Sequence, residues 1–265
     1  MNHPSFDYAR CSACGTCARS CPLRLIGANE TGHPRFRDDA IACMSCGHCA
    51  AVCPREAISL ARDGAPPNVT PCGSVMRAAP HPADTKAYAA ILSHRSHRAY
   101  TSVPVPRNLI ELAIEAAQYA PSGKNAHGIE WTVFENADSI RKAGLALAAR
   151  LRQIPERAIR YKYVPADEDA VYWGASALVV VHGDPAASLI RDDGVIAATV
   201  FDYAAQSLGL ATCMSGTAQN APDLIREFAG IPASHDIHAV IMVGHPVERF
   251  LRLPPRKPAR ITWRS

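Results

Sequence analysis

The sequence lacks the features of a membrane-spanning or secreted protein. Its longest apolar run, from Ala143 to Ala149 with Gly144 counted in, is far shorter than the ~18 residues that a transmembrane helix needs. The first residues, Met1 to Arg10, have neither the basic region nor the apolar region of a secretory signal. We therefore expect a cytoplasmic protein that does not bind a membrane.

Signals for nucleic-acid and dinucleotide binding are scarce as well. The net charge is +4 and there is no long block of Lys and Arg, so the sequence does not favour nucleic-acid binding. No G-x-G-x-x-G fingerprint follows an expected strand, so we expect no dedicated Rossmann site for NAD(P)H. Hydrophobic residues make up 48% of the 265 residues, which suits a globular protein with one small and one medium domain.

Cysteine is abundant for a chain without a secretion signal. Eight of the ten cysteines fall between Cys11 and Cys53, and such density points to metal rather than to disulfides. They form the spacing Cx2Cx2Cx3CP twice, as Cys11, Cys14, Cys17 and Cys21 before Pro22 and as Cys43, Cys46, Cys49 and Cys53 before Pro54. This spacing predicts two [4Fe-4S] clusters. Structural zinc, whose ligands usually come as separated pairs, is disfavoured.

The two clusters are expected to exchange their fourth ligands. The last cysteine of each run lies too far along the chain to serve its own cluster and ligates the other one. One cluster would then take Cys11, Cys14, Cys17 and Cys53, and the other Cys43, Cys46, Cys49 and Cys21. The remaining cysteines, Cys72 and Cys213, have no partners at ligand spacing and are expected to be ordinary thiols.

Composition divides the chain into two domains and a linker. Residues 1–60 are rich in cysteine and suit a small domain that is held together by its metal. Residues 61–82 are rich in Gly and Pro, which indicates a linker, and residues 83–265 form the larger domain. The stretch from Tyr8 to Ser59 resembles bacterial two-cluster ferredoxins, which implies that the small domain transfers electrons.

Helical and strand patterns alternate in the larger domain. The spacing of apolar residues predicts a helix over 107–119 and another between 194 and 208 that stops at Gly209. Strands are expected over 129–134, 176–181 and 238–243, and the second of them reads as a central strand that is buried on both faces. This mixture indicates an α+β or α/β layer structure.

Five motifs in the larger domain point to a flavin. The first, His94-Arg95-Ser96-His97-Arg98, suits an anionic cofactor, although a solvated basic turn fits its composition equally well. The others follow in order as Ala120-Pro121-Ser122-Gly123-Lys124-Asn125, Leu208-Gly209-Leu210-Ala211-Thr212-Cys213, Gly244-His245-Pro246 and Arg256-Lys257-Pro258. With these motifs in this order, residues 83–265 resemble the nitroreductase family of FMN enzymes. The resemblance implies an α+β fold, an FMN-binding sheet with surrounding helices, and a homodimer with FMN at the subunit interface.

The resemblance also implies roles for individual residues. Arg256, with Lys257 and the beginning of the Arg95 segment, would neutralise the FMN phosphate. Arg98 would lie near the pyrimidine edge of the isoalloxazine, where a positive charge stabilises the reduced flavin. Further FMN contacts are expected from His94, Arg95, Ser96, His97, Ser122, Asn125, Met214, Ser215 and Gly216.

Two positions depart from the family pattern. His94 stands where Arg is common, so this contact is expected to depend on pH. His127-Gly128-Ile129 replaces the usual Gln-Pro-Trp beside the flavin, so the substrate preference of relatives does not transfer. His127 itself is a weak candidate for a catalytic proton donor, and the alternative is an ordinary polar loop residue.

These expectations combine into an iron-sulfur flavoprotein oxidoreductase. The clusters would accept electrons singly, and FMN would collect two and pass them to an electron-poor small molecule such as a nitroaromatic. The electron donor would be a ferredoxin or NAD(P)H. Two alternatives stay open: an electron-transfer protein that serves a partner enzyme, and a reductase of another activated metabolite, acting on an alkene or a carbon-halogen bond.

Overall fold

The computed structural model describes residues 3–37, 42–60, 85–187, 189–254 and 256–264. Contacts divide the chain into two compact units, one of Met1–Ser93 with Glu248–Ser265 and the other of His94–Val247. The sequence assigns residues 248–265 to the flavin domain, whereas the structure groups them with the N-terminal unit. The expected linker over 61–82, with Cys72, lies outside the described residues.

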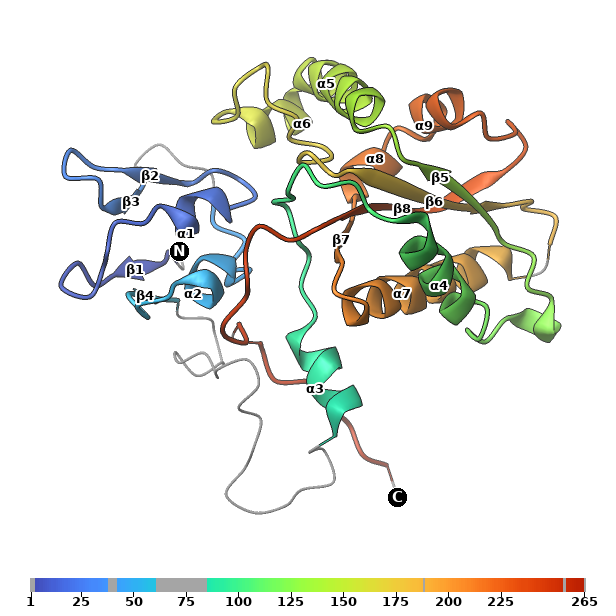
Figure 1. The fold of residues 1–265 in the computed structure, drawn as a ribbon, viewed down its shortest axis with the longest axis horizontal. Helices are drawn as coiled ribbons and strands as arrows, with labels where there is room; N and C mark the ends of the chain where they lie inside the picture. The colour runs from blue at the N-terminus through green and yellow to red at the C-terminus, as the bar shows by residue number, and fades with distance from the viewer. Residues whose placement is uncertain (1–2, 38–41, 61–84, 188, 255, 265) are drawn as a thin grey trace. The chain divides into compact units, whose positions relative to one another are not determined.

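The N-terminal unit consists of short elements around a small core. β1 pairs with β4 and β2 pairs with β3, both antiparallel (Figure 1). Cysteines make up a large part of the core that these elements enclose. The elements are β1 (Ser5–Phe6), α1 (Thr16–Arg19), β2 (Ile26–Ala28), β3 (Pro34–Phe36), α2 (His48–Val52) and β4 (Ile58–Ser59). Helix α3 (Lys86–Ser93) is grouped with this unit and has no buried side chain.

The two cysteine runs fold into matching backbone turns. Ala13 and Ser45 have left-handed φ values of 53° and 52°. Gly15 and Gly47, with φ of 71° and 77°, follow them and precede α1 and α2. A positive φ is uncommon outside glycine, so finding it at the same place in both runs shows that the repeated spacing produces a repeated structure.

The segment after Val247 packs against the N-terminal unit. The Leu251 N–H donates to the carbonyl of Ala51 at 2.8 Å. The ring of Phe250 meets that of His48 edge to face, with centroids 5.1 Å apart. The end of the chain is thereby attached beside the helix that carries Cys49.

The second unit is built on one antiparallel sheet. Its strands are β5 (Glu130–Phe134), β6 (Ala177–Gly183), β7 (Ala211–Met214) and β8 (Asp236–Gly244), in the order β5-β6-β8-β7. All seven residues of β6 are buried, as its apolar run predicts. Leu178 and Val180 face one core cluster, while Val179 and Val181 face the other, because successive side chains of a strand point to opposite sides.

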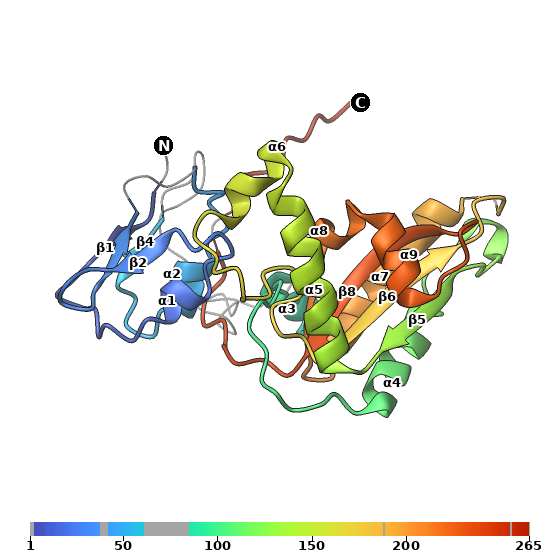
Figure 2. The same ribbon diagram turned by 90° about the horizontal axis from the view of Figure 1, so that it is seen from above.

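Helices cover both faces of this sheet (Figures 1 and 2). α4 and α7 pack on one face, and α5, α8 and α9 supply buried side chains to the core on the other. The helices are α4 (Arg107–Ala117), α5 (Ala137–Arg152), α6 (Pro155–Ala158), α7 (Ile190–Ser207), α8 (Gly216–Gln219) and α9 (Pro222–Ala229), with 3-10 turns η1 (Gly123–Asn125) and η2 (Ile159–Tyr161). Among the described residues, none of the helices is both long and apolar enough to cross a bilayer.

Strand β8 carries a β-bulge opposite the end of β6. Val181 pairs with Ala239 but His182 pairs with Ile237, so His238 is the additional residue. His238 packs against α7, since a Cβ added to Gly194 would lie 2.5 Å from the His238 ring. The bulge therefore interrupts the pairing of β8 next to His182, and the pairing resumes at Ile237 and Asp236.

Candidate functional site

The eight cysteines of the N-terminal unit gather in two groups of four. Burial raises the pKa of the Cys17 thiol to about 11, and the neighbouring thiolates that raise it further are Cys53, Cys14 and Cys11. Burial also raises the pKa of Cys49, and the thiolates beside it are Cys46, Cys21 and Cys43. Each group thus joins three cysteines of one run to the last cysteine of the other, which is the grouping that the crossed assignment requires.

Backbone N–H groups point at four of these sulfurs, in corresponding places of the two halves. The pairs, at 3.3 to 3.4 Å, are Ala13 with Cys11, Ser45 with Cys43, Leu25 with Cys21 and Ala57 with Cys53. Hydrogen bonds to thiolate sulfur stabilise its charge and influence the reduction potential of a bound cluster. Two sets of four thiolates with such donors fit two all-cysteine iron-sulfur clusters.

Arg252 brings a buried positive charge to one of the two groups. Its guanidinium donates to the backbone carbonyl of Cys53 and, at 3.4 Å, to that of Ala50. It also pairs with the Glu56 carboxylate at 3.1 Å and holds the pKa of that group below its ordinary value. Only 9% of Arg252 is exposed, so its charge acts on the Cys53 group with little screening by water.

In the second unit, Gln206 of α7 holds the basic segment in place. Its amide oxygen accepts from the Arg95 N–H at 3.3 Å, and its amide nitrogen donates to the Arg95 carbonyl at 2.8 Å. The same nitrogen lies 2.8 Å from the hydroxyl of Thr212 in β7. The backbone of the segment also meets β7 directly, because the His97 N–H donates to the Thr212 carbonyl at 2.8 Å.

Asp202, one helical turn before Gln206, is a second anchor. Its carboxylate accepts from His94 Nε2 at 2.8 Å and from the hydroxyl of Thr212. The His94 ring also packs on Tyr203, with centroids 4.4 Å apart. His94 is therefore engaged within the chain, and burial lowers the pKa of its neighbour His97 to about 4, which keeps that ring neutral at physiological pH.

Three of the five predicted motifs come together at this place. The Thr101 N–H donates to the His245 carbonyl at 2.9 Å, and Tyr100 forms a bridge with Pro246. Gly244 lies against the Tyr100 ring, where an added Cβ would be 2.6 Å from a ring carbon. The Gly-His-Pro motif thus holds the end of the basic segment, and the Thr212-Cys213 motif holds its middle.

Cys213 lies within this assembly rather than free at the surface. Burial raises the pKa of its thiol, while Arg98 and a hydrogen bond from Ser96 act in the opposite direction. Arg98 and Ser96 therefore both lie close to the start of the turn that follows β7. That turn begins at Met214, and its Ser215 caps α8 by accepting from the Ala218 N–H at 3.3 Å.

Gly216 gives the turn an open side. A Cβ added at this position would meet no atom within 4 Å in the part of the chain that the structure describes. The backbone at the start of α8 is therefore accessible to a flat ligand. With the cation of Arg98 on one side, the turn has the donor chemistry that the anionic, reduced form of a flavin needs.

The predicted loop over 121–125 has a strained backbone. Lys124, Asn125 and His127 have left-handed φ values of 54°, 57° and 46°. The Asn125 amide oxygen lies 2.9 Å from His127 Nε2, and the Ser122 hydroxyl accepts from the His127 N–H at 3.2 Å. Such conformations cost free energy and tend to occur where a ligand is held. His127 is exposed and serves here as the partner of two predicted flavin contacts.

The loop and the basic segment attach to opposite ends of α7 (Figure 1). The Gly123 N–H donates to Asp193 near the start of the helix at 2.9 Å, whereas Arg95 is bound to Gln206 near its end. At ~1.5 Å per residue, the helix separates these anchors by roughly 20 Å. The structure therefore does not bring Ser122 and Asn125 together with Ser96 and Arg98 within one chain. Arg256 and Lys257 belong to the other unit.

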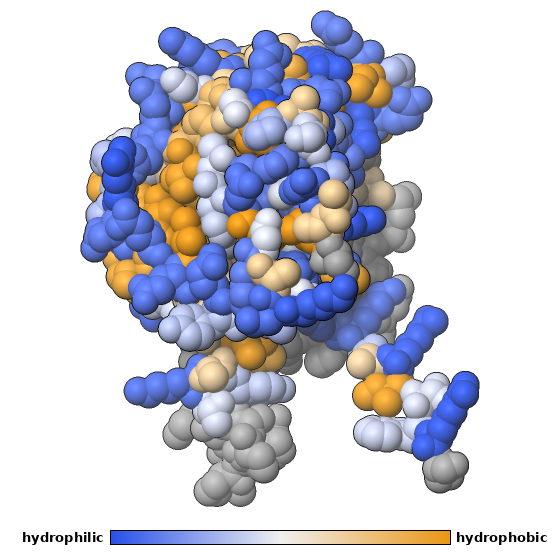
Figure 3. Space-filling model, turned by 90° about the vertical axis from the view of Figure 1, so that its right-hand side faces the viewer, coloured by the Kyte–Doolittle hydropathy of each residue, from blue (hydrophilic) through white to orange (hydrophobic). Residues whose placement is uncertain are grey.

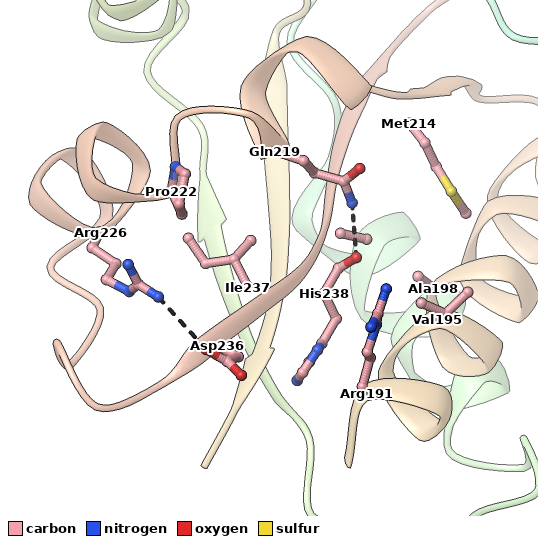
Figure 4. Close-up of a pocket in the computed structure, with 11 residues that line it drawn as sticks. Arg191, Val195, Ala198, Met214, Gln219, Pro222, Arg226, Asp236, Ile237 and His238 are labelled. Atoms are coloured by element: carbon pink, nitrogen blue, oxygen red, sulfur yellow. Dashed lines mark hydrogen bonds and ion pairs between the residues drawn. The ribbon is translucent and has the colours of Figure 1, made fainter. Parts of the chain in front are cut away.

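A pocket of about 580 Å³ lies beside the Met214 turn, between α7, α8, α9 and the start of β8. Figure 4 shows His238 and Arg191 side by side in it, and Gln219, which donates to the His238 carbonyl at 2.7 Å. Arg226 and Asp236 form an ion pair on another side of the pocket, 3.8 Å apart. The pocket thus has a mixed polar and apolar lining that includes Arg191, and it contains Met214, a predicted flavin contact.

Comparisons with known proteins agree with this division of the chain. Residues 91–245 match the nitroreductase family, and residues 10–58 match the 4Fe-4S dicluster domain. The chain belongs to the nitroreductase family, with a 4Fe-4S dicluster domain at its N-terminus. It is an FMN-dependent oxidoreductase that carries two iron-sulfur clusters in addition to FMN.

Individual relatives support the same conclusion. The FMN reductase (NAD(P)H) of Bacillus subtilis (strain 168) is 28% identical over 170 residues, which cover 62% of this chain and 68% of the relative. A nitroreductase with bound FMN from Desulfitobacterium hafniense is 25% identical, with a TM-score of 0.52 over 68% of this chain and 99% of that one. An FMN-dependent nitroreductase from Clostridium difficile, at 19% identity, shares the fold with a TM-score of 0.56 over 69% of this chain and all of its own.

The sequence missed the residues that position the site. Asp202 and Gln206 stand one turn apart on α7 and were visible only as the more polar side of a helix. Arg252 gave no signal beyond its place in a basic C-terminal stretch. Their partners are far away along the chain, so spacing does not reveal them.

Proposed function

We propose that this protein takes electrons one at a time through its two clusters, collects two on FMN and reduces an electron-poor small molecule such as a nitroaromatic. The observation that carries the proposal is that one chain combines two groups of four cysteines with a basic segment fixed against α7 and β7, where the turn after β7 is open at Gly216. When bound, the clusters pass single electrons and FMN exchanges electrons singly or in pairs. The chain's own residues bind, orient and tune these groups.

In the N-terminal unit, we assign the cluster ligands by the crossed pattern. One cluster is held by Cys11, Cys14, Cys17 and Cys53, and the other by Cys43, Cys46, Cys49 and Cys21. The backbone donors at Ala13, Ser45, Leu25 and Ala57 orient the sulfurs. Anaerobically purified protein is expected to contain about eight iron atoms and about one FMN per chain.

In the second unit, we assign the flavin contacts to two separate surfaces of the chain. The first comprises His94, Arg95, Ser96, His97 and Arg98 with Met214, Ser215 and Gly216. Arg98 stabilises negative charge on the flavin ring, and the Met214 turn offers backbone to it. The second comprises Ser122 and Asn125, which supply neutral hydrogen bonds. Outside this unit, we assign Arg256 and Lys257 to the FMN phosphate.

The two surfaces lie at opposite ends of α7, so we propose that FMN binds between two copies of the chain. Each site then takes the first surface from one copy and the loop with Ser122 and Asn125 from the other. Apolar side chains gathered among polar ones on one side of the molecule (Figure 3) are consistent with such an interface. Those exposed on α4, α7 and their flanks include Leu112, Tyr119, Leu189, Val195 and Ile196.

Mixed dimers test this arrangement. Arg98→Ala damages the first surface and Asn125→Ala damages the second, so each variant alone is expected to bind FMN about 10 to 100-fold more weakly. In a dimer of one Arg98→Ala chain and one Asn125→Ala chain, isolated through two different tags, one site has both surfaces intact. We expect one tightly bound FMN per mixed dimer, measured by flavin fluorescence. Two weak sites and no tight one would place both surfaces in the same chain and refute the shared site.

The acceptor is tested by a single turnover. Protein reduced anaerobically with dithionite is mixed with a nitroarene, and reoxidation of the flavin is followed by its absorbance. Rapid reoxidation supports the enzyme. Reoxidation by an oxidised partner protein, but not by a nitroarene, an activated alkene or a halogenated compound, would instead support an electron carrier.

The donor is expected to be NAD(P)H or a reduced ferredoxin. NAD(P)H is favoured because the Bacillus subtilis relative carries it in its name. Anaerobic mixing with each donor, followed at wavelengths where clusters and flavin differ, shows which group is reduced first. A ferredoxin is expected to reduce the clusters first, and a nicotinamide the flavin. The cytoplasmic location and the domain limits at 1–60, 61–82 and 83–265 stay predictions.

A further inference from the structure

Three potential metal ligands converge at one end of the sheet in the second unit. They are Glu130 at the start of β5, His182 near the end of β6 and His235 just before β8. One ligand atom from each residue lies within 4.8 Å of the other two. About 50 residues separate each from the next in sequence, and the sheet brings them together because Glu130 is directly paired with His182.

The distances between these atoms approach those of a tetrahedral zinc site. Nδ1 of His182 lies 3.0 Å from Nδ1 of His235, and the latter lies 3.9 Å from Oε1 of Glu130. Two imidazole nitrogens bound to Zn²⁺ at ~2.05 Å and a tetrahedral angle are about 3.3 Å apart. A shift of roughly 0.3 Å would therefore admit an ion between the two rings.

The His182 ring is already oriented by a contact on its far side, and His235 is held through its backbone. Nε2 of His182 lies 2.9 Å from the hydroxyl of Thr132, which leaves Nδ1 to face the other two ligands. A partner on the second ring nitrogen is the usual arrangement of histidines that bind metal. The backbone of His235 is held by Arg226, whose Nε donates to the His235 carbonyl at 3.0 Å. Nδ1 of His182 and the backbone of His235 are thus positioned before any ion arrives.

The burial of the three residues suits an ion with one open coordination position. His182 is buried, His235 is partly buried, and 61% of the Glu130 side chain is exposed to solvent. Water therefore reaches the carboxylate side and would supply a fourth ligand. The bulge at His238 interrupts the strand pairing beside His182, and bulges often re-aim side chains next to a functional site.

The cluster is separate from the flavin surfaces. Glu130, Thr132 and Phe134 alternate along β5 and share one face, because side chains of a strand alternate with period two. Phe134 packs on the core that α5, α8 and α9 cover, whereas α7 lies on the other face. The three ligands therefore lie on the side of the sheet away from α7, which anchors both flavin surfaces.

We propose that Glu130, His182 and His235 form a binding site for a divalent zinc ion, with water as the fourth ligand. Imidazole and carboxylate are ligands that Zn²⁺ accepts, and three protein ligands suffice to hold it. The ion links β5, β6 and the segment before β8. It therefore stabilises the start of β5, which directly follows the loop over 121–128.

The test uses the full-length holoprotein, prepared without oxygen so that iron occupies the cluster cysteines. Zinc and iron are counted together by elemental analysis after dialysis against limiting ZnCl₂, and Zn²⁺ affinity is measured by calorimetry. We expect one zinc per chain beyond a full complement of cluster iron. His235→Asn and Glu130→Gln are expected to weaken Zn²⁺ binding by about 100-fold or more, and Thr132→Val by about 10 to 100-fold, with the iron content unchanged.

Two variants serve as matched controls. Glu111→Gln removes an exposed carboxylate from α4, and His33→Asn removes a histidine from the N-terminal unit. Both are expected to retain the zinc. Because Glu130 is exposed, its variant should fold even if a change at buried His182 does not. Absence of zinc from wild-type protein with full iron, or equal loss in the control variants, would show that the two histidines only form a hydrogen bond with each other.

Discussion

Two side chains of α7 hold the basic segment (residues 94–98) in its position. Gln206 makes two hydrogen bonds to the backbone of Arg95 and one to Thr212. The flavin surface is therefore positioned by a residue that we do not expect to touch the flavin. Asp202 has the same role for His94.

Replacing Gln206 with Leu is expected to loosen this segment. The hydrogen bonds of the Gln206 amide to the Arg95 backbone, to Thr212 and to Asp202 are lost, so we expect a loss of about 1 to 3 kcal/mol in stability. FMN should bind roughly 10-fold more weakly, as measured by fluorescence titration, because the donors are no longer held in place. Gln118→Leu, at the exposed end of α4, is the control. Equal effects of the two variants would mean that Gln206 does not position the segment.

His97 is expected to make stability depend on pH. Burial lowers its pKa in the folded protein to about 4, below the ~6.5 of an unfolded chain. The unfolded state therefore takes up a proton first, and stability falls as the pH drops from about 6.5 toward about 4. Above that window the effect of His97 is absent.

We expect this loss to reach about 1 to 3 kcal/mol at the acid end. Urea unfolding of apoprotein at about pH 7.5 and about pH 5, followed by tryptophan fluorescence, measures most of it. His97→Gln should lose stability less steeply across that window. A variant as sensitive to acid as the wild type would assign the effect to other groups, such as buried His182 and His238, whose pKa values burial also lowers.

Among the helices and strands, those with a regular spacing of apolar residues were predictable from the sequence. β6 is buried along its whole length and α4 shows a clear apolar stripe, so burial and spacing alone indicate them. α5 was not predicted. Its Gly144 packs so closely on Asp169 that an added Cβ would lie 2.2 Å from a carboxylate oxygen, and such a contact has no sign in the local sequence.

The sequence names candidate residues for the flavin site but does not predict how they are arranged in space. The motifs with Arg95, Ser122 and Met214 follow one another along the chain, and linear order does not tell which of them share a surface. Two of them meet at β7, while the Ser122 loop lies at the other end of α7. The Glu130, His182 and His235 cluster escaped detection for a similar reason, because strand pairing and not spacing assembles it.

The contact between Gly244 and Tyr100 links the end of β8 to the basic segment. Gly244→Ala is expected to push the Tyr100 ring away, since the new Cβ would stand 2.6 Å from it. The Tyr100 hydroxyl would then lose its 2.7 Å hydrogen bond to the His97 carbonyl. We expect a cost of about 1 to 3 kcal/mol, measured by chemical denaturation.

A double variant checks the cause of this effect. In a Tyr100→Ala background the ring is absent, so adding Gly244→Ala should cost much less than it does alone. Such non-additivity is the mark of a direct contact. Purely additive costs would indicate that the glycine is needed for some other reason.

For the molecule as a whole, the return of the chain to the N-terminal unit brings Arg252 beside one cluster group. Arg252→Gln removes a buried positive charge next to Cys53, which disfavours the more negative, reduced cluster. We expect the potential of that cluster to fall by an amount on the order of tens of millivolts, measured by a redox titration followed by electron paramagnetic resonance. Arg252→Lys should retain most of the potential, and exposed Arg249→Gln should leave it unchanged. A shift as large in Arg249→Gln would assign the effect to overall charge.

The exchange of fourth ligands that we propose for the cysteine runs would make the two clusters depend on each other during damage. If an oxidant destroys one cluster, the cysteine that it received from the other run becomes a free thiol beside the remaining cluster. Both cysteine loops then lose a bond that holds them in place. Partly loaded intermediates should therefore be short-lived, and exposure to air should convert intact molecules directly into molecules without either cubane. The lifetime of the intact protein in an aerated cell would then be set by the cluster that is oxidised faster.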